Sequence, residues 1–151
     1  MRLEFFGIDE LNFVEFNTTS DDMNFYRLNG ESKFINSEVF NLFAHCFEES
    51  NELYEYYEPT KFNARKIVVL RNNLVANYEK LCAIKNQNDF VMFIDSIFMG
   101  KAFLTEIERL DADWVKNWDN YFIKIKEANQ EMISIVERCI DEIRVLWVIG
   151  Y

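Results

Sequence analysis

The first 36 residues have the short apolar runs and turn signals of a small antiparallel sheet. Residues 11–16 are rich in aromatic and branched side chains, as β-strands are, and a polar stretch follows them. Residues 25–28 and 31–35 flank the dipeptide Asn29-Gly30, which favours the type I′ turn of a β-hairpin. Because two or three strands alone are only marginally stable, we expect this segment to pack against the rest of the chain.

From residue 37 onward, apolar residues recur at helical spacing. Pro59 ends the first predicted helix, since proline disfavours the helical conformation in the residue before it. Each of the four predicted helices begins beside a residue whose side chain can cap it: Ser37, Thr60, Asp89 and Asp111. The connections between these helices are short, which favours helices that run up and down beside one another.

The residues after Asp111 carry the most regular pattern in the chain. Apart from one polar residue, Asn129, apolar side chains alternate three and four positions apart over more than four heptads: Val115, Trp118, Phe122, Ile125, Met132, Val136, Cys139, Ile143 and Leu146. A single helix over residues 112–148 would be about 55 Å long, whereas a compact chain of this length is about 40 Å across. We therefore predict a long helix that bends near Asn129, lengthens the bundle or reaches a partner, with Asn129 either fixing its register or meeting solvent.

Together these patterns predict a mainly α protein of one domain, residues 1–151. Residues 1–36 form its β-containing segment, a small N-terminal antiparallel hairpin or sheet, and residues 37–151 form an up-and-down bundle of about four helices. Half of the residues are hydrophobic and 17% are aromatic, which is enough for a sizeable core. Three scattered cysteines, no secretory signal and no membrane-spanning apolar run lead us to expect a cytoplasmic protein that enters no membrane.

Charge changes this picture because it is concentrated in one part of the chain. Residues 1–58 hold 13 acidic and 3 basic residues, so they account for the whole net charge of −10, whereas residues 59–151 hold 13 of each sign. No basic residue lies between Lys33 and Lys61. Because phosphate binding needs clustered Lys and Arg, we expect no direct contact with nucleic acid.

The densest group of acidic residues lies in the second half of the first predicted helix. Glu48, Glu52 and Glu55 are spaced so that they would share one helical face. Carboxylates bind Arg and Lys through charge-assisted hydrogen bonds, and tyrosine rings stack on guanidinium groups. We therefore predict that a basic protein binds here, on what we call the acidic–tyrosine surface: Glu48, Glu49, Glu52, Glu55, Glu58, Tyr54, Tyr56 and Tyr57.

The same glutamates could instead be neutralised inside the fold. If the next helix folds back antiparallel to the first, three bases at its start would face Glu58, Glu55 and Glu52: Lys61, Arg65 and Lys66. Acidic side chains also keep small proteins soluble without serving any partner. The ion pairs of these glutamates therefore decide between a binding surface and a purely structural role.

Signals for catalysis are weak. His45 is the single histidine, which leaves no Ser-His-Asp triad and no site with two histidine ligands. Cys46 would point about 100° away from His45 on a helix, too far for a nucleophile and its base. Asp111 and Asp113 fit a helix start better than a metal site, and no glycine-rich phosphate loop is present. We therefore expect no catalytic residue, no metal site and no cofactor.

These observations predict a non-enzymatic acidic protein that inhibits a basic partner such as a toxin, a nuclease or a nucleic-acid-guided effector. Such an inhibitor, of the immunity or antitoxin type, occupies a positively charged cleft, in some cases as a mimic of nucleic acid. Two other functions fit the sequence. The C-terminal heptad helix could pair with its copy in a homo-oligomeric scaffold, a homodimer in the simplest case, or Trp114, Trp118 and His45 could line a pocket for a small ligand or an enzymatic reaction.

Overall fold

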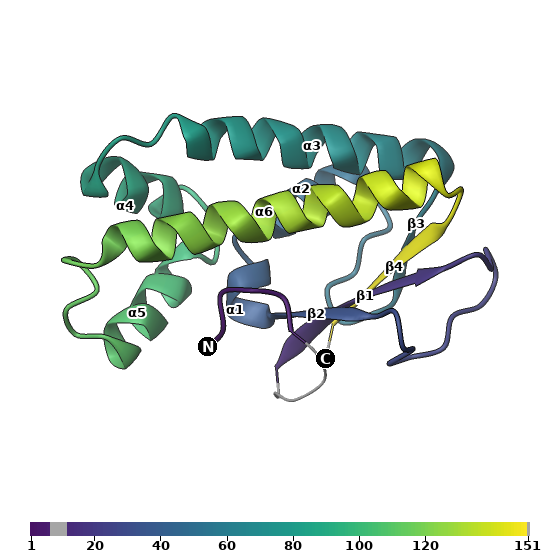
Figure 1. The fold of residues 1–151 in the computed structure, drawn as a ribbon, viewed down its shortest axis with the longest axis horizontal. Coiled ribbons are helices and arrows are strands. Elements are labelled where there is room, and N and C mark those ends of the chain that lie inside the picture. The colour runs from purple at the N-terminus through teal and green to yellow at the C-terminus, as the bar shows by residue number, and fades with distance from the viewer. Residues whose placement is uncertain (7–11, 151) are drawn as a thin grey trace.

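The computed structural model describes residues 1–6 and 12–150, which form six helices and one four-stranded antiparallel sheet (Figure 1). The strands are β1 (Phe13–Thr19), β2 (Lys33–Asn36), β3 (Thr60–Phe62) and β4 (Val145–Gly150). The helices are α1 (Ser37–Phe40), α2 (Ala44–Ser50), α3 (Ala64–Cys82), α4 (Gln87–Asp95), α5 (Gly100–Leu110) and α6 (Trp118–Asp141). The fold is therefore mixed α and β, with 51% of the residues helical, rather than the predicted mainly α bundle of four helices. The expected antiparallel pairing within residues 1–36 is present as β1 and β2, which belong to a larger sheet than predicted.

The sheet draws on both ends of the chain. Its strand order is β2-β1-β4-β3, so the C-terminal strand β4 lies in the middle, paired with β1 and β3. Residues 145–148 were expected to continue the last helix, but their branched and aromatic side chains suit a strand. Ile143, with a φ of 54°, turns the chain between α6 and β4.

The predicted hairpin around Asn29-Gly30 is also wrong. β2 pairs with β1 directly, and residues 20–32 form an irregular connection between these two strands. Two buried polar side chains of β1 hold that connection: the Glu15 carboxylate accepts a hydrogen bond from the Leu28 amide (2.8 Å), and Asn17 donates one to the Tyr26 carbonyl (2.7 Å). These bonds to β1 override the local preference of Asn29-Gly30 for a hairpin.

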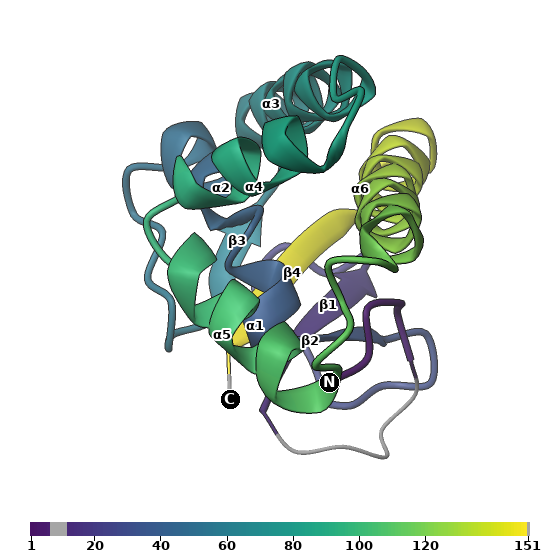
Figure 2. The same ribbon diagram turned by 90° about the vertical axis from the view of Figure 1, so that its left-hand side faces the viewer.

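The two long helices α3 and α6 lie side by side over the sheet, as the two ribbon views show (Figures 1 and 2). Their apolar stripes meet in the core, and a buried amide pair joins them: Asn77 donates to Asn129 (2.8 Å), and Asn129 donates to the Leu74 carbonyl (3.0 Å). Asn129 thus fixes the register of the two helices. With 24 residues, α6 is about 36 Å long, so no bend is needed to fit it into a compact chain.

The other predicted helices are broken by local contacts. The first one, expected over residues 37–58, is two short helices, α1 and α2, and the third is divided into α4 and α5 by a corner at residues 96–99. Thr60 begins strand β3 rather than a helix, and Asp111 closes a turn before α6 by accepting a hydrogen bond from the Asp113 amide (2.9 Å). Across the described residues, no helix has both the length and the apolar character that crossing a bilayer requires.

Candidate binding site: an acidic pocket beside α2

Only part of the acidic–tyrosine surface is helical. Glu48 and Glu49 lie on α2, whereas Glu52, Glu55 and Glu58 lie on the irregular loop formed by residues 51–59. The predicted i, i+4, i+7 stacking of the glutamates on one helix is therefore wrong, although all five side chains remain exposed.

Asn51 explains why α2 stops where it does. Its side chain is almost fully buried, accepts hydrogen bonds from the Leu53 amide (3.1 Å) and from Lys66 Nζ (2.7 Å), and donates one to the Lys61 carbonyl (3.1 Å). One amide thus ties the start of the loop to β3 and α3. Asparagine favours such side-chain-to-backbone bonds over continued helix, and here tertiary partners complete them.

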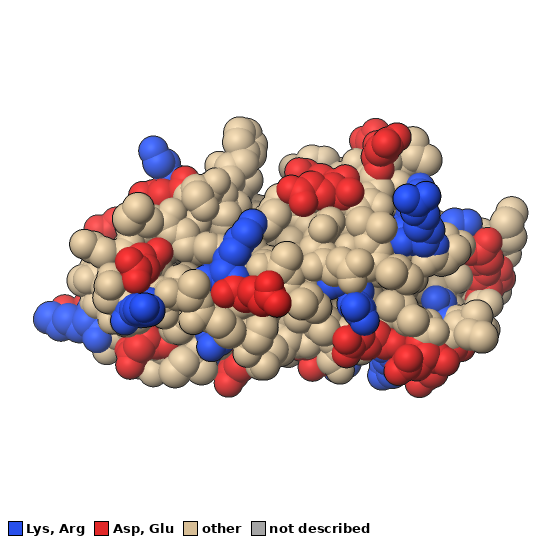
Figure 3. Space-filling model, turned by 90° about the horizontal axis from the view of Figure 1, so that it is seen from above, with Lys and Arg blue, Asp and Glu red and all other residues tan. Residues whose placement is uncertain are grey.

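The five glutamates are not neutralised within the fold. In the part of the chain that the structure describes, none of the five forms an ion pair. Two of the bases that were candidates for pairing are engaged elsewhere, since Lys61 lies 3.4 Å from an Asp22 carboxylate oxygen and Lys66 binds Asn51. The loop and α2 therefore present unbalanced negative charge. On the face over α3, by contrast, acidic and basic side chains are interspersed (Figure 3).

The three tyrosines of the surface have different environments. Tyr54 is half-buried between Phe47 (ring centroids 6.2 Å apart) and Phe62 (6.3 Å), and burial raises its pKa well above the ordinary value. Tyr56 is also half-buried, against the Phe40 ring. Tyr57 is 78% exposed. Tyr54 and Tyr56 therefore anchor the loop, whereas the Tyr57 ring is available to a partner.

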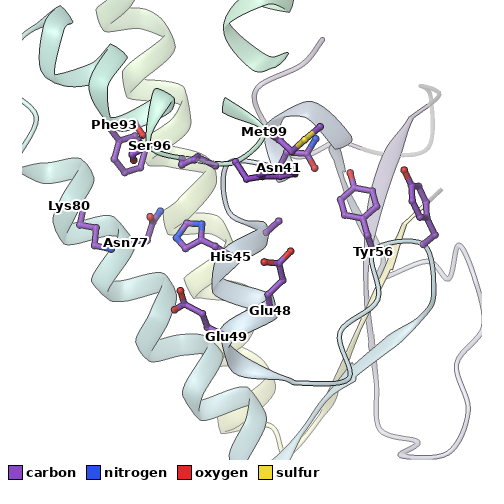
Figure 4. A pocket seen from close by; sticks show the side chains of 14 residues that line it. Asn41, His45, Glu48, Glu49, Tyr56, Asn77, Lys80, Phe93, Ser96 and Met99 are labelled. Carbon is purple, nitrogen blue, oxygen red and sulfur yellow. Dashed lines mark hydrogen bonds between the residues drawn. The ribbon is translucent and has the colours of Figure 1, made fainter. Parts of the chain in front are cut away.

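A pocket of about 600 Å³ lies between α2, α3, the 51–59 loop and the corner that joins α4 to α5 (Figure 4). Its acidic and tyrosine side is lined by Glu48, Glu49, Tyr56 and Tyr57, and its apolar side by Phe93, Ile97, Phe98 and Met99. Phe98 is 96% exposed, so the corner presents an uncovered aromatic ring beside the carboxylates. The helical spacing of the sequence places Phe93 and Ile97 on the inward stripe of the third predicted helix and Phe98 outside it, but it does not indicate that these residues reach α2.

The floor of the pocket is polar. It is formed by His45 from α2 and by Asn77 and Lys80 from α3 (Figure 4). Burial lowers the pKa of His45 below its ordinary value of 6.5, against the opposing effects of the Glu49 and Glu48 carboxylates; Lys80 lowers it further. The neighbouring Asn77 amide acts to raise the pKa of His45, because its oxygen could accept a hydrogen bond from the protonated ring. The two groups do not form this hydrogen bond in the structure.

His45 and Cys46 lie close together, although their positions on a helix point about 100° apart. Cys46 Sγ is 3.4 Å from His45 Nε2. Burial, together with the Glu49 charge, raises the pKa of the Cys46 thiol to about 12. The thiol is therefore protonated near pH 7 and is not an activated nucleophile.

The balance of charges around His45 gives a testable pH dependence. We expect the His45 ring to titrate below pH 6.5, so the folded chain binds this proton less readily than the unfolded chain does. The contribution of the neutral His45 ring to the free energy of unfolding is therefore complete above pH 6.5, and it is lost as the pH falls through the lower pKa of the folded state. Glu49→Gln should lower the pKa further and Lys80→Gln should raise it. Nuclear magnetic resonance of the ring protons measures this directly, and shifts of the opposite sign in the two variants would contradict it.

The alternative site around the tryptophans is not assembled in the structure. His45 lines the pocket, but neither Trp114 nor Trp118 does. Trp118 instead packs against Phe90 (ring centroids 6.0 Å apart) and Phe122 (5.7 Å) at the start of α6. The described residues also contain no group of three or more His, Cys, Asp or Glu side chains placed to hold a metal ion.

The heptad seam of the last predicted helix is largely used within the chain. Four of its members are buried in the core: Ile125, Met132, Val136 and Cys139. Ile143 is 90% exposed and lies beyond the end of α6, and Leu146 belongs to β4. The seam is thus not an open face along α6 that would require a second copy to cover it.

Comparison with known proteins assigns this chain to no group: no family model, no curated protein and no solved structure matches it.

Proposed function

We propose that this protein is a non-enzymatic inhibitor that binds a basic partner protein through the acidic–tyrosine surface and the pocket beside α2. The observation that carries the proposal is that none of the five glutamates of this surface forms an ion pair within the described chain. Unpaired carboxylates repel one another when the protein is free, and a cationic partner relieves that repulsion.

The apolar groups beside the carboxylates would supply binding energy that charge alone does not. Protein interfaces combine a desolvated centre, enriched in aromatic and Met side chains, with a polar rim, and a few side chains in that centre contribute most of the binding energy. Here the exposed rings of Tyr57 and Phe98 and the partly exposed Met99 lie on the pocket that Glu48 and Glu49 also line. The carboxylates would steer a basic protein toward the site, and the apolar groups would hold it there.

A toxin, a nuclease or a nucleic-acid-guided effector is the partner class that fits this chemistry. Proteins that act on nucleic acid present Lys and Arg along the cleft that receives the phosphates. An acidic surface that occupies such a cleft blocks it without any catalytic group of its own. As part of the proposal, the protein acts in the cytoplasm, where the three free thiols, Cys46, Cys82 and Cys139, remain reduced.

Charge reversal on the surface tests the proposal. The variant Glu48→Lys/Glu52→Lys/Glu55→Lys is immobilised beside the unaltered protein, and both are exposed to extract of the native cells at low salt. We expect a basic protein to bind the unaltered protein, to be released at high salt, and to be absent from the variant, because exposed charge pairs are screened by salt. Mass spectrometry identifies the bound protein.

A matched variant distinguishes the surface from overall charge. Glu108→Lys/Glu127→Lys/Glu137→Lys makes the same charge change at three exposed positions of α5 and α6. We expect this variant to retain the partner. Equal retention by the variant with reversed charges at Glu48, Glu52 and Glu55 would reject the acidic–tyrosine surface as the binding site.

A further inference from the structure

We infer that the pocket beside α2 receives an arginine side chain of the basic partner, with Oδ1 of Asn77 accepting a hydrogen bond at the floor and the carboxylates of Glu48 and Glu49 supplying the opposite charge. This inference rests on the proposed function and names the group that the site recognises. It depends on one buried amide whose orientation the core determines.

The orientation of the Asn77 side chain follows from its partners. The Leu74 carbonyl can only accept, so the nitrogen of the Asn129 amide must face it, at 3.0 Å. The Asn129 oxygen then faces Asn77, which must present its own nitrogen, at 2.8 Å. A backbone carbonyl thus fixes both amides, and the oxygen of Asn77 is directed away from α6 toward the pocket that this residue lines.

That oxygen has no hydrogen-bond partner among the described residues, although the His45 ring lies beside it. Asn77 is only 2% exposed, and no described residue donates a hydrogen bond to its Oδ1. Buried polar atoms are nearly always hydrogen-bonded, and an unsatisfied one points to a missing ligand or water. Oδ1 itself has almost no accessible surface and lies beside the His45 ring, so a donor from outside reaches this acceptor when the ring turns aside.

The ligand that fits is a cation. Two carboxylates, Glu48 and Glu49, line the pocket against a single ammonium, Lys80, and burial keeps the His45 ring neutral near pH 7. Figure 4 shows His45 between Asn77 and the two glutamates, so acceptors from α2 and α3 are spread around one space. A donor-rich positive group gains hydrogen bonds and charge pairing from the same set of atoms.

Arginine suits this arrangement better than lysine. Its guanidinium is a planar fork of five N–H donors that can reach acceptors on two helices, whereas an ammonium concentrates its charge at one point. The apolar wall of Phe93, Ile97 and Met99 can cover the aliphatic part of the side chain. A pocket of about 600 Å³ has room for the whole side chain.

His45 provides the readout because it is the only histidine in the chain and lies in the pocket. The probes are three acetylated, amidated tripeptides, Gly-Arg-Gly, Gly-Lys-Gly and Gly-citrulline-Gly, titrated into the full-length protein. Citrulline has the shape of arginine without its charge. We expect saturable shifts of the His45 ring resonances with the arginine peptide, at least about fivefold weaker binding of the lysine peptide, and no saturation with citrulline. Equal shifts with arginine and citrulline would overturn the inference.

Two pairs of isosteric variants separate the pocket from the general field of the surface. Glu48→Gln/Glu49→Gln should weaken binding of the arginine peptide at least about fivefold. Glu52→Gln/Glu55→Gln removes the same two charges outside the pocket and should change binding by less than about twofold, because exposed charges at a distance are screened. Equal weakening by both pairs would contradict a specific arginine site.

Asn77 is replaced together with Asn129, because replacing only one of the two would leave the amide of the other without its hydrogen-bond partner in the core. Asn77→Leu/Asn129→Leu replaces both buried amides with apolar side chains, a change that can leave stability nearly unaltered. We expect this variant to fold and to lose the preference for arginine over lysine; if the preference survives in the folded variant, Asn77 is not the acceptor. The peptide titrations use no partner protein. Their failure would reject the arginine pocket while capture of a basic partner still stands, and failed capture would reject the proposed function while arginine binding still stands.

Discussion

Replacing Phe47 with alanine is expected to lower the free energy of unfolding by about 3–5 kcal/mol, as large-to-small substitutions at buried aromatic positions do. Phe47 is fully buried, and its ring contacts the rings of Phe16 on β1 (5.7 Å between centroids), Phe40 on α1 (4.9 Å) and Phe62 on β3 (5.7 Å). It also packs against Tyr54 of the 51–59 loop. One side chain thus joins α2, which carries part of the acidic surface, to the sheet and to the loop that carries the rest.

Urea unfolding followed by circular dichroism measures this loss. Phe98→Ala is the matched control, because it deletes the same atoms at a position that is 96% exposed, and it should change stability by less than about 0.5 kcal/mol. Similar losses in the two variants would show that Phe47 does not have the core position described here.

Gly100→Ala is expected to destabilise the protein by at least about 2 kcal/mol, because overpacking forces the backbone to move. A Cβ atom at Gly100 would lie 1.8 Å from the carbonyl oxygen of Ile94. This oxygen belongs to the backbone and cannot rotate aside as the end of a flexible side chain could. The close approach makes the tight corner between α4 and α5, which carries Phe98 and Met99 on the pocket wall. The variant should therefore also shift the ring resonances of His45 across the pocket.

Gly30→Ala is the control for this substitution. A Cβ atom there would meet nothing within 4 Å, and Gly30 has no positive φ. Such a change should be neutral or stabilising by about 0.4–1 kcal/mol, because alanine restricts the unfolded chain. If Gly100→Ala changed stability as little as Gly30→Ala in thermal and urea unfolding, the corner between α4 and α5 would not depend on the absence of a Cβ atom at residue 100.

Sequence periodicity located the long helices because their contacts follow a single stripe. In α6 the predicted seam positions Ile125, Met132, Val136 and Cys139 are all buried, and Asn129 lies where that stripe meets α3. Over such a length, an amphipathic pattern outweighs local exceptions. The prediction failed at the C-terminal end of the seam. The spacing of Ile143 and Leu146 matches a helix, but α6 ends at Asp141 and Leu146 belongs to strand β4.

The elements that depend on distant partners were not predictable in the same way. The helix expected over residues 37–58 ends at Ser50 because Asn51 finds partners in Lys61 and Lys66, and those contacts exist only in the folded chain. Strand β4 has a partner in β1, more than 120 residues away along the sequence. Local preference is a weak guide where pairing partners are this remote.

The candidate site was likewise predictable only where its residues are close together in the sequence. The unbroken run of acids was visible in the sequence, since no base lies between Lys33 and Lys61. The apolar wall at Phe98 and the oriented amide of Asn77 come from segments 30 to 50 residues further along, and only packing brings them to α2. Two signals in the sequence pointed to these residues: Asn77 is a polar residue among the apolar positions of α3, and Phe98 lies outside the helical spacing of the apolar residues before it.

The salt dependence of the affinity between this protein and its captured partner tests the central claim most directly. In calorimetric titrations from about 50 to about 300 mM salt, the account predicts that the dissociation constant rises at least about tenfold for the unaltered protein. In Glu48→Lys/Glu52→Lys/Glu55→Lys, binding should be lost or nearly independent of salt. An affinity that is the same at both salt concentrations and in both proteins would contradict an inhibitor that acts through unpaired carboxylates.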